Sequence, residues 1–487
     1  MKLGSLLGMD DQTPVTGFAI DHRKVAPGTI FGAFEGAKVN GEDCIEAAIA
    51  AGAVAVVARP GVRVEGAVHI SNDEPRRSFA LLAAKFFQPF PVICVAVTGT
   101  NGKTSTVEMT RQLWRMTGHP AASIGTLGVT TGDDRVVTGL TTPDIVTFLS
   151  NMAGLNREGV SHVAFEASSH GLHQCRTEGL PVRAAAFTNL SRDHLDYHGD
   201  IANYFTAKMR LFSEVVDSDG AVVVWADAGE YSARVIDLAR ERGLALLTVG
   251  ERGSTLRLAE RSPGQLGQQL IIEAEGKTHK ISLPLIGAYQ AANALVAAGL
   301  VIATGGDVST TLGNLSRLQP VRGRLERAVI TQSGAPVYVD YAHTPDALEA
   351  AIEALRPHCK GRLILVFGAG GVRDAGKRPE MGAIAAQLAD HVIVTDDNPR
   401  SEDPAEIIRE IEKGLPKKCN HISVLDRAEA IEAAVQNALS GDIILIAGKG
   451  HETYQQFADR TIDFDDRKKA DFALRKRSEA IAEMRAN

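Results

Sequence analysis

A short glycine-rich stretch, VTGTNGKTS at residues 97–105, contains the residue types that most directly suggest chemistry. It follows the apolar run PVICVA and precedes STVEMTRQLWRMTG, so the pattern predicts a strand, a tight turn and a helix. Exposed N–H groups at a helix N-terminus stabilise bound phosphate. We therefore expect the backbone of residues 99–104 to hold the β- and γ-phosphates of a nucleotide. Lys103 would neutralise the γ-phosphate, and the Thr104 hydroxyl would bind Mg²⁺.

The stretch is shorter than the common phosphate loop. The pattern GxxxxGK[ST] needs a glycine at position 97, where this chain has Val97, so only GxxGKT from Gly99 remains. A turn of this composition that binds no nucleotide is the alternative interpretation. The strand before the turn and the helix after it favour the nucleotide site.

Two polar side chains follow later strands and are candidates to complete a metal site. Glu166 ends the apolar run HVAFE, and His194 lies in NLSRDHLDYHGD after the run AAAFT. The carboxyl ends of parallel strands meet at one sheet edge, so both should lie near the loop at 97–105. A carboxylate there is a natural Mg²⁺ ligand. A structural role would explain either residue alone, but three polar strand ends at one edge favour a site.

These residues must be positioned by more than one domain, because the chain of 487 residues exceeds the about 250–300 that a single core supports. Continuous Val, Ile and Ala runs alternate with helical patterns, which is typical of strands covered on both faces by helices. We expect an α/β protein of three domains. They are a small N-terminal α/β domain (1–88), a central doubly wound, mostly parallel sheet with the short phosphate loop (89–318) and a C-terminal Rossmann-like α/β domain (319–487). Within the central domain, QQLIIEAEGKTHKISLPL predicts an antiparallel hairpin that turns at Glu275 and Gly276.

The composition limits the class of protein. A net charge of −7 argues against a nucleic-acid surface, and the five cysteines are scattered without metal-binding or disulfide spacing. No apolar run reaches the about 18 residues of a membrane span, and the N-terminus lacks the apolar core of a signal peptide. We expect a cytoplasmic monomer that acts on small molecules, without a nucleic-acid or membrane partner.

Several blocks occur in an order that resembles the Mur ligases, and the resemblance covers essentially the whole chain. They are TGTNGKTS, TTPD, EASSHGL, TNLSRDHLDYHGD, AKMRLF, GAYQAANALVAAG, GRLE, DYAHTPDALE, GAGGVRDAGKRP, DDNPRSEDP and AGKGHETYQ. The short loop GxxGK[ST] is the form found in this family. The resemblance implies that ATP, as co-substrate with Mg²⁺, activates a carboxylate of a UDP-sugar peptide as an acyl phosphate, which an amino acid then attacks. It assigns UDP-sugar binding to residues 1–88, ATP binding and ligation to 89–318 and amino-acid binding to 319–487.

The resemblance also implies roles for individual residues. The expected ATP contacts are Gly99, Thr100, Asn101, Gly102, Lys103, Thr104, Ser105, Asn293, Arg324, Asp340 and His343. The expected metal ligands are Thr104, Glu166, His194 and Lys208, the last as a carbamate, and the catalytic set is Lys103, Lys208, His194 and Arg324. The expected UDP-sugar contacts are Asp21, His22, Arg23, Thr141, Thr142, Ser168 and Arg176. The chain departs from the family at IDHR, where His22 replaces a serine, and at VNGED, where Asn40 replaces an aspartate.

The identity of the added amino acid depends on residues 397–400, which read DNPR. This form resembles that of the family members that add meso-diaminopimelate to the D-Glu carboxylate of UDP-MurNAc-L-Ala-D-Glu. A guanidinium can bind the second carboxylate of diaminopimelate, which lysine lacks. The expected contacts are Arg373, Asp397, Asn398, Pro399, Arg400, Gly448 and Glu452, the last accepting the distal ammonium.

Three alternatives remain open at this level. A lysine-adding ligase differs only in the amino-acid pocket. Folylpolyglutamate synthetase shares the central fold and the short loop, but it has no counterpart of the first domain or of DNPR. A phosphate-loop nucleotide switch has no need for an amino-acid pocket.

Overall fold

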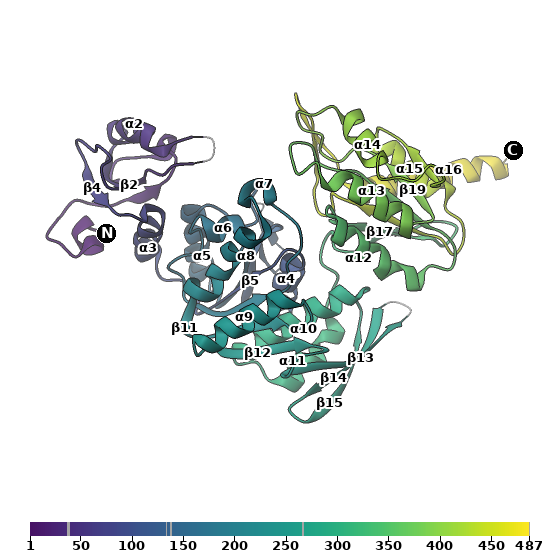
Figure 1. Cartoon of the computed structure of the whole chain (residues 1–487), viewed down its shortest axis with the longest axis horizontal. Helices are drawn as coiled ribbons and strands as arrows, with labels where there is room; N and C mark the ends of the chain where they lie inside the picture. Colours follow the sequence, from purple (N-terminus) through teal and green to yellow (C-terminus); the bar gives the residue numbers. More distant parts are fainter. Residues whose placement is uncertain (37–38, 133, 137–138, 265–266, 487) are drawn as a thin grey trace.

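The computed structural model describes residues 1–36, 39–132, 134–136, 139–264 and 267–486, with side chains described as far as residue 476. Three larger sheets follow one another along the chain, and Figure 1 shows them as purple, teal and green-to-yellow regions. No helix in the described part of the chain combines the length and apolar composition that a membrane crossing needs.

The first sheet is parallel, with strand order β1-β2-β3-β4. Its elements are α1 (Leu3–Leu7), β1 (Gly17–Ala19), η1 (His22–Lys24), β2 (Thr29–Gly32), η2 (Gly41–Cys44), α2 (Ile45–Ala50), β3 (Ala53–Ala58), β4 (Val68–Ser71) and α3 (Pro75–Phe87). In β3, Val56 packs with Ile45 of α2, whereas its neighbours Ala55 and Val57 share a core with Phe79 of α3. Alternate residues of a strand face opposite sides, so the run AVAVVA needs a helix on each face.

The central sheet has the strand order β15-β14-β13-β12-β11-β10-β5-β9-β6-β7-β8. Its strands are β5 (Ile93–Thr98), β6 (Ala121–Gly125), β7 (Gly128–Thr131), β8 (Asp134–Val136), β9 (His162–Glu166), β10 (Val182–Phe187), β11 (Val216–Trp225), β12 (Ala245–Gly250), β13 (Leu256–Gly264), β14 (Gly267–Ala274) and β15 (Lys277–Leu283). Its helices are α4 (Lys103–Met116), α5 (Ile145–Arg157), α6 (Ser169–His173), α7 (Leu195–His198), α8 (Ile201–Arg210), η3 (Leu211–Val215), α9 (Glu230–Glu241), α10 (Ala288–Ala303), α11 (Val308–Asn314) and η4 (Leu315–Arg317).

Strand β5 lies in the middle of this sheet, between β9 and β10, and pairs with both in parallel. After β5 the chain builds β6 on one side, returns through β9 and then crosses to β10 on the other side. The direction of winding therefore reverses beside β5, and a crevice at the carboxyl ends of the strands follows from that reversal. The loop at 97–105 leaves β5 at this place.

The expected hairpin is confirmed. Strands β14 and β15 pair antiparallel, with Ala274 opposite Lys277, so Glu275 and Gly276 form a two-residue turn. Both turn residues have positive φ, 50° and 70°, which matches the right-handed twist of the two strands.

The third sheet has the strand order β16-β17-β21-β18-β19-β20, parallel except for the edge strand β16. Its strands are β16 (Glu326–Ile330), β17 (Pro336–Asp340), β18 (Leu363–Phe367), β19 (His391–Val394), β20 (His421–Ser423) and β21 (Ile443–Ala447), and β22 (Tyr454–Gln456) with β23 (Thr461–Asp463) forms a separate hairpin. Its helices are α12 (Pro345–Leu355), η5 (Arg356–His358), α13 (Lys377–Leu388), α14 (Pro404–Glu412), α15 (Arg427–Asn437) and α16 (Asp466–Ala486).

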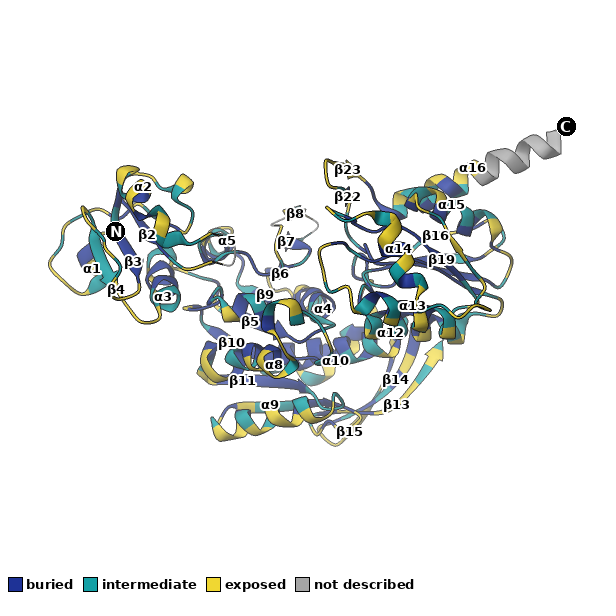
Figure 2. Cartoon of the chain, turned by 45° about the horizontal axis from the view of Figure 1, so that its top comes forward, coloured by how far each residue is buried: buried dark blue, intermediate teal, exposed yellow. Residues whose placement is uncertain are grey.

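The predicted α/β fold class is therefore confirmed. Figure 2 shows buried strands beneath helices whose outer faces are exposed. The expected boundaries at 88 and 318 fall between elements, since α3 ends at Phe87 and η4 at Arg317. Helix α3 packs against α5, so the first sheet and the central sheet share one hydrophobic cluster.

Candidate active site

The phosphate-loop residues form a tight turn between β5 and α4. Gly99 and Gly102 have φ values of 146° and 88°, a region that only glycine enters without strain. A Cβ at Gly99 would overlap Thr188 Oγ1, and a Cβ at Gly102 would overlap Asn293 Oδ1. Val97, where a longer loop would have its first glycine, is fully buried inside β5.

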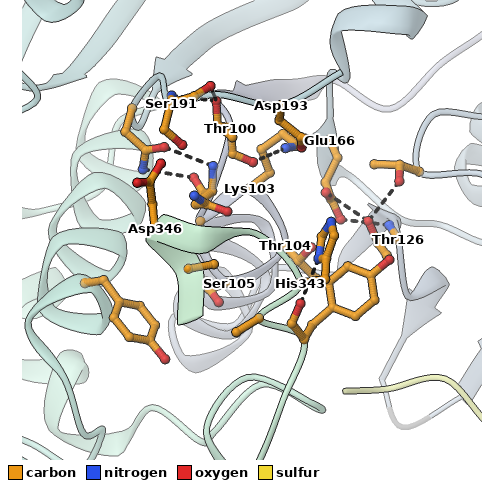
Figure 3. A pocket seen from close by; sticks show the side chains of 18 of the residues that line it. Thr100, Lys103, Thr104, Ser105, Thr126, Glu166, Ser191, Asp193, His343 and Asp346 are labelled. Atoms are coloured by element: carbon orange, nitrogen blue, oxygen red, sulfur yellow. Dashed lines mark hydrogen bonds between the residues drawn. The ribbon is translucent and has the colours of Figure 1, made fainter. Parts of the chain in front are cut away.

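Lys103 folds back over this turn. Its Nζ donates to Gly99 O at 2.9 Å and to Thr100 O at 2.7 Å. Burial lowers the pKa of Lys103, while the charges of Glu166 and Asp193 raise it. The ammonium therefore lies among anionic side chains at the mouth of the loop (Figure 3).

Glu166 ends β9, beside the loop. It is 2 % exposed and accepts hydrogen bonds from Thr126 N at 2.7 Å and from Thr126 Oγ1 at 3.2 Å. Burial raises the pKa of Glu166, and the nearby Lys103 lowers it. The positive charge of Lys103 favours the ionised form of this buried carboxylate, which is the form that can bind a metal ion.

Lys208, on α8, is 1 % exposed and donates to Gly99 O at 2.6 Å. Its Nζ also lies 4.3 Å from the centre of the Tyr204 ring. Burial, and then the charge of Lys103, lower the pKa of Lys208 well below its ordinary value. The amine is therefore much more often neutral than an ordinary lysine, and only a neutral amine can add CO₂.

His194 and Asp193 stand at the entrance of the same site. His194 has φ 53°, and its Nε2 lies 3.4 Å from Asp193 Oδ2. Burial lowers the pKa of His194 to about 3, against the opposing charge of Asp193. The imidazole is therefore neutral at pH 7 and can act as a ligand or an acceptor.

The third sheet contributes the opposite wall. Asp340, at the end of β17, accepts from Leu325 N at 2.6 Å and from Ala342 N at 2.8 Å, and burial raises its pKa to about 6. His343 Nδ1 lies 2.8 Å from Tyr341 O, and burial lowers its pKa to about 4.

Arg324 joins the two walls. Its Nη2 donates to Thr104 Oγ1 at 3.1 Å, and its guanidinium lies 4.5 Å from the centre of the Tyr341 ring.

A cavity of about 460 Å³ collects these groups. The expected residues that line it are Thr100, Asn101, Gly102, Lys103, Thr104, Ser105, Thr141, Glu166, Ser168, His194, Lys208, Asn293, Arg324, Asp340 and His343. It is also lined by residues that the sequence did not single out, among them Thr126, Ser191, Asp193, Tyr289 and Asp346. Asp193 stands next to His194 in a recognised block, whereas no motif marks Thr126.

The expected sugar contacts fall into two separate groups. Asp21, His22 and Arg23 belong to the first sheet's domain, where the Arg23 guanidinium donates to Asp21 at 2.7 Å. The second group surrounds the end of β9: Thr142 Oγ1 lies 3.0 Å from Ser168 Oγ, and Arg176 Nη1 donates to Thr142 O at 2.8 Å. Thr141 Oγ1 lies 3.0 Å from Thr126 Oγ1.

The expected amino-acid contacts gather where β18, β19 and β21 end. Arg373 follows β18, and residues 397–400 follow β19. Arg400 has φ 55° and donates through Nη1 to Gly371 O at 2.8 Å. Gly448 follows β21, and a Cβ on it would overlap Asp397 Oδ2. Pro399 O would likewise meet a Cβ at Gly371, so the loops after β18 and β19 pack directly on each other.

Known protein families match the three parts of the chain in the order in which the three sheets occur. Three family models match: "Mur ligase family, catalytic domain" at residues 14–85, "Mur ligase middle domain" at 97–301 and "Mur ligase, glutamate ligase domain" at 323–450. A UDP-N-acetylmuramoyl-L-alanyl-D-glutamate--2,6-diaminopimelate ligase of Zymomonas mobilis is 59% identical over 93% of both chains. The protein of the same name from Bradyrhizobium diazoefficiens is 49% identical over 98% of this chain and 100% of its own.

Solved structures share the fold. A structure of a UDP-N-acetylmuramoyl-L-alanyl-D-glutamate--2,6-diaminopimelate ligase superposes with a TM-score of 0.72 at 30% identity, over 98% of this chain and 99% of its own. MurF ligase from Thermotoga maritima in complex with ADP shares the fold, with a TM-score of 0.62 at 20% identity over 96% of this chain and 98% of its own. Folylpolyglutamate synthase from Mycobacterium tuberculosis shares the fold over only 77% of this chain and 92% of its own, with a TM-score of 0.64 at 20% identity. The chain therefore belongs to the Mur ligase family.

Proposed function

We propose that the chain is an ATP-dependent amide-bond ligase that adds meso-2,6-diaminopimelate to the D-Glu carboxylate of UDP-MurNAc-L-Ala-D-Glu, in cytoplasmic peptidoglycan precursor synthesis. One observation carries the proposal. A single cavity joins a phosphate loop on the central sheet with Arg324, Asp340 and His343 from the third sheet, which also bears the DNPR loop. The near-full-length diaminopimelate ligases at 59% and 49% identity support it.

The reaction begins with activation of the carboxylate. A carboxylate oxygen of D-Glu attacks the γ-phosphorus of ATP, ADP leaves, and an acyl phosphate forms. Two anions must approach each other, so the main task of the site is to supply fixed positive charge. Lys103 lies at the mouth of the loop and Arg324 reaches Thr104, so both cations stand beside the position expected for the γ-phosphate.

The second step forms the amide. The neutral amine of the amino acid attacks the acyl carbon, and the tetrahedral intermediate expels phosphate, which keeps one oxygen of the original carboxylate. The attacking nitrogen loses one of its two protons to the surroundings, and the other remains as the amide N–H. Positioning of the amine against the acyl phosphate provides the rate enhancement, because the two partners then react as one molecule.

The protein would supply some of the Mg²⁺ ligands, and the substrates would supply the others. Within the described residues, no group of three or more His, Cys, Asp and Glu side chains is placed to hold a metal ion. Thr104, Glu166, His194 and a carbamate on Lys208 would supply oxygen and imidazole ligands, with phosphate oxygens completing the set. When bound, Mg²⁺ would offset the charge of the phosphate and the carboxylate. The suppressed pKa of Lys208 supports the carbamate, because that amine loses its proton readily.

We assign the other contacts by position. Residues 1–88 bind the UDP-sugar through Asp21, His22 and Arg23, together with Thr141, Thr142, Ser168 and Arg176 of the central domain (89–318). The ATP contacts are residues 99–105 with Asn293, Arg324, Asp340 and His343. Residues 319–487 bind diaminopimelate through Arg373, residues 397–400, Gly448 and Glu452. We propose that the protein acts as a monomer.

The test is turnover of the purified protein with ATP, Mg²⁺ and UDP-MurNAc-L-Ala-D-Glu. Meso-diaminopimelate should give ADP, phosphate and a product heavier by the added residue, whereas L-lysine should react at least about 100-fold less efficiently. Carboxylate labelled with ¹⁸O should transfer one labelled oxygen to phosphate. Equal turnover with L-lysine and diaminopimelate would indicate a lysine-adding ligase. ADP release at the same rate with and without the sugar peptide would indicate a nucleotide switch.

A further inference from the structure

Lys449 occupies the loop after β21, between the expected amino-acid contacts Gly448 and Glu452. Its side chain is 0% exposed. Its Nζ lies 3.0 Å from Asn398 Oδ1 and 3.1 Å from Glu452 Oε2, and 5.5 Å from the centre of the Tyr454 ring. A buried ammonium is costly unless it is paired, so these two acceptors are what allows Lys449 to be charged at this place.

Asn398 is hydrogen-bonded to both Lys449 and Glu452, so the three side chains form a triangle of mutual contacts. Its Nδ2 donates to Glu452 Oε2 at 2.8 Å, and its Oδ1 accepts from both Lys449 Nζ and Gln456 N, each at 3.0 Å. Oε2 of Glu452 thus receives two hydrogen bonds. Across the described residues no hydrogen bond is found at Oε1. The carboxylate is held in one orientation with one oxygen free for a ligand.

The triangle also ties together the loops that carry the pocket. Asn398 O accepts from Gly371 N at 2.9 Å, which connects the loop after β19 to the loop after β18. Arg400 N donates to Gln456 O at 3.0 Å, which connects the same loop to β22. Lys449 therefore lies where three loops meet, and it contacts two of the residues expected to bind the amino acid.

We propose that Lys449 is a positioning residue of the amino-acid pocket, which holds Glu452 so that its Oε1 accepts the distal ammonium of diaminopimelate. The inference rests on the proposed function. Arg400 would bind the distal carboxylate of diaminopimelate, next to the distal ammonium. The carboxylate and the ammonium would thus be bound by two different loops, and the hydrogen bond between Lys449 and Asn398 fixes the position of one loop relative to the other.

The charge balance of the pocket gives a second reason for a cation at this place. Two acids with little exposure act on each other here: Asp397 is 8% exposed, and the side chain of Glu452 is 14% exposed. Burial raises the pKa of Glu452, Lys449 lowers it, and the charge of Asp397 raises it. Without the ammonium, Glu452 would be more readily protonated, and a neutral carboxyl attracts an ammonium poorly.

The test uses Lys449→Met in the full-length protein, with KM measured for each substrate at saturating levels of the other two. We expect KM for diaminopimelate to rise about tenfold or more, while KM for ATP and for the sugar peptide stays within about twofold. If Lys449→Met fails to fold by circular dichroism, Lys449→Gln, which keeps a donor for Asn398, replaces it.

A double-mutant cycle separates positioning through Glu452 from a general structural effect. If Lys449 acts through Glu452, the effect of Lys449→Met on KM should largely disappear in a Glu452→Gln background. The matched control is Arg362→Met, which removes an ion pair with buried Asp442 at the amino ends of β18 and β21. This control should leave KM for diaminopimelate unchanged.

Three outcomes would overturn the inference: an unchanged KM for diaminopimelate in Lys449→Met, additive effects in the cycle, or no effect of Glu452→Gln alone. Failure of the unmodified protein to ligate diaminopimelate would instead refute the proposed function.

Discussion

The guanidinium of Arg324 donates to the hydroxyl of Thr104 at 3.1 Å, although the two residues lie beside different sheets. Arg324 precedes β16 of the third sheet, and Thr104 lies in the first turn of α4 on the central sheet. The same guanidinium packs on Tyr341, which follows β17. A fixed cation of the C-terminal region thus reaches the phosphate loop.

We predict that Arg324→Met lowers kcat by about 100-fold or more, because the variant loses a preorganised charge at the developing phosphate. KM for ATP should change much less, since Lys103 and the backbone of the loop remain. Steady-state kinetics with all three substrates would check this. Arg322→Met is the control, because Arg322 pairs instead with Asp465 at 3.5 Å. A normal kcat in Arg324→Met would exclude the role.

The activity of the protein should depend on carbon dioxide through Lys208. Because its amine is buried with a suppressed pKa, we expect it to form a carbamate, and activity in CO₂-depleted buffer should rise when bicarbonate is added. With ¹³C-bicarbonate, a carbamate resonance should appear in the ¹³C NMR spectrum of the protein and be missing in Lys208→Met. The assignment fails if bicarbonate changes neither the spectrum nor the rate.

Arg400→Ala should sharply weaken the use of diaminopimelate. The lost charge-assisted hydrogen bonds correspond to a rise in KM of about 30-fold or more, with ATP and sugar-peptide KM nearly unchanged. Arg409→Ala, which removes an exposed arginine that pairs with Glu406 on α14, serves as the comparison. Near-normal diaminopimelate kinetics in Arg400→Ala would assign the second carboxylate to another group, such as Arg373.

Ionisation of the buried Asp340 should make the protein less stable as pH rises. Burial raises its pKa from 3.8 to about 6, so the folded state retains a proton that the unfolded chain has lost. Stability from this group is therefore fully present below pH 3.8 and is lost as pH rises toward 6. We expect Asp340→Asn to raise the midpoint of thermal unfolding at pH 7.5 but much less at pH 4, while weakening ATP binding. Equal shifts at both pH values would contradict this origin.

The sequence predicted the layers, and which residues would gather around one cavity, better than it predicted the contacts among those residues. Runs such as PVICVA specify strands covered on both faces, and the block around Lys103 specifies the turn after β5. The role of Lys449 was not predicted, although AGKGHETYQ was recognised, because it depends on Asn398 from a loop about fifty residues away. Thr126 was missed for a similar reason: its contact with Glu166 arises only from the pairing of β6 with β9.

Asp340 and the loops that bear Asn398 and Glu452 follow β17, β19 and β21, which belong to one sheet, so a displacement of that sheet would carry all three together. A nucleotide that contacts both Lys103 and Asp340 would fix the position of that sheet against the central sheet. Binding of ATP would then already restrict the movement of the part of the protein that binds the amino acid, so the entropy lost when the amino acid binds would be smaller. The two ligands should therefore be thermodynamically coupled: each should increase the affinity of the other by the same factor, even though they need not touch.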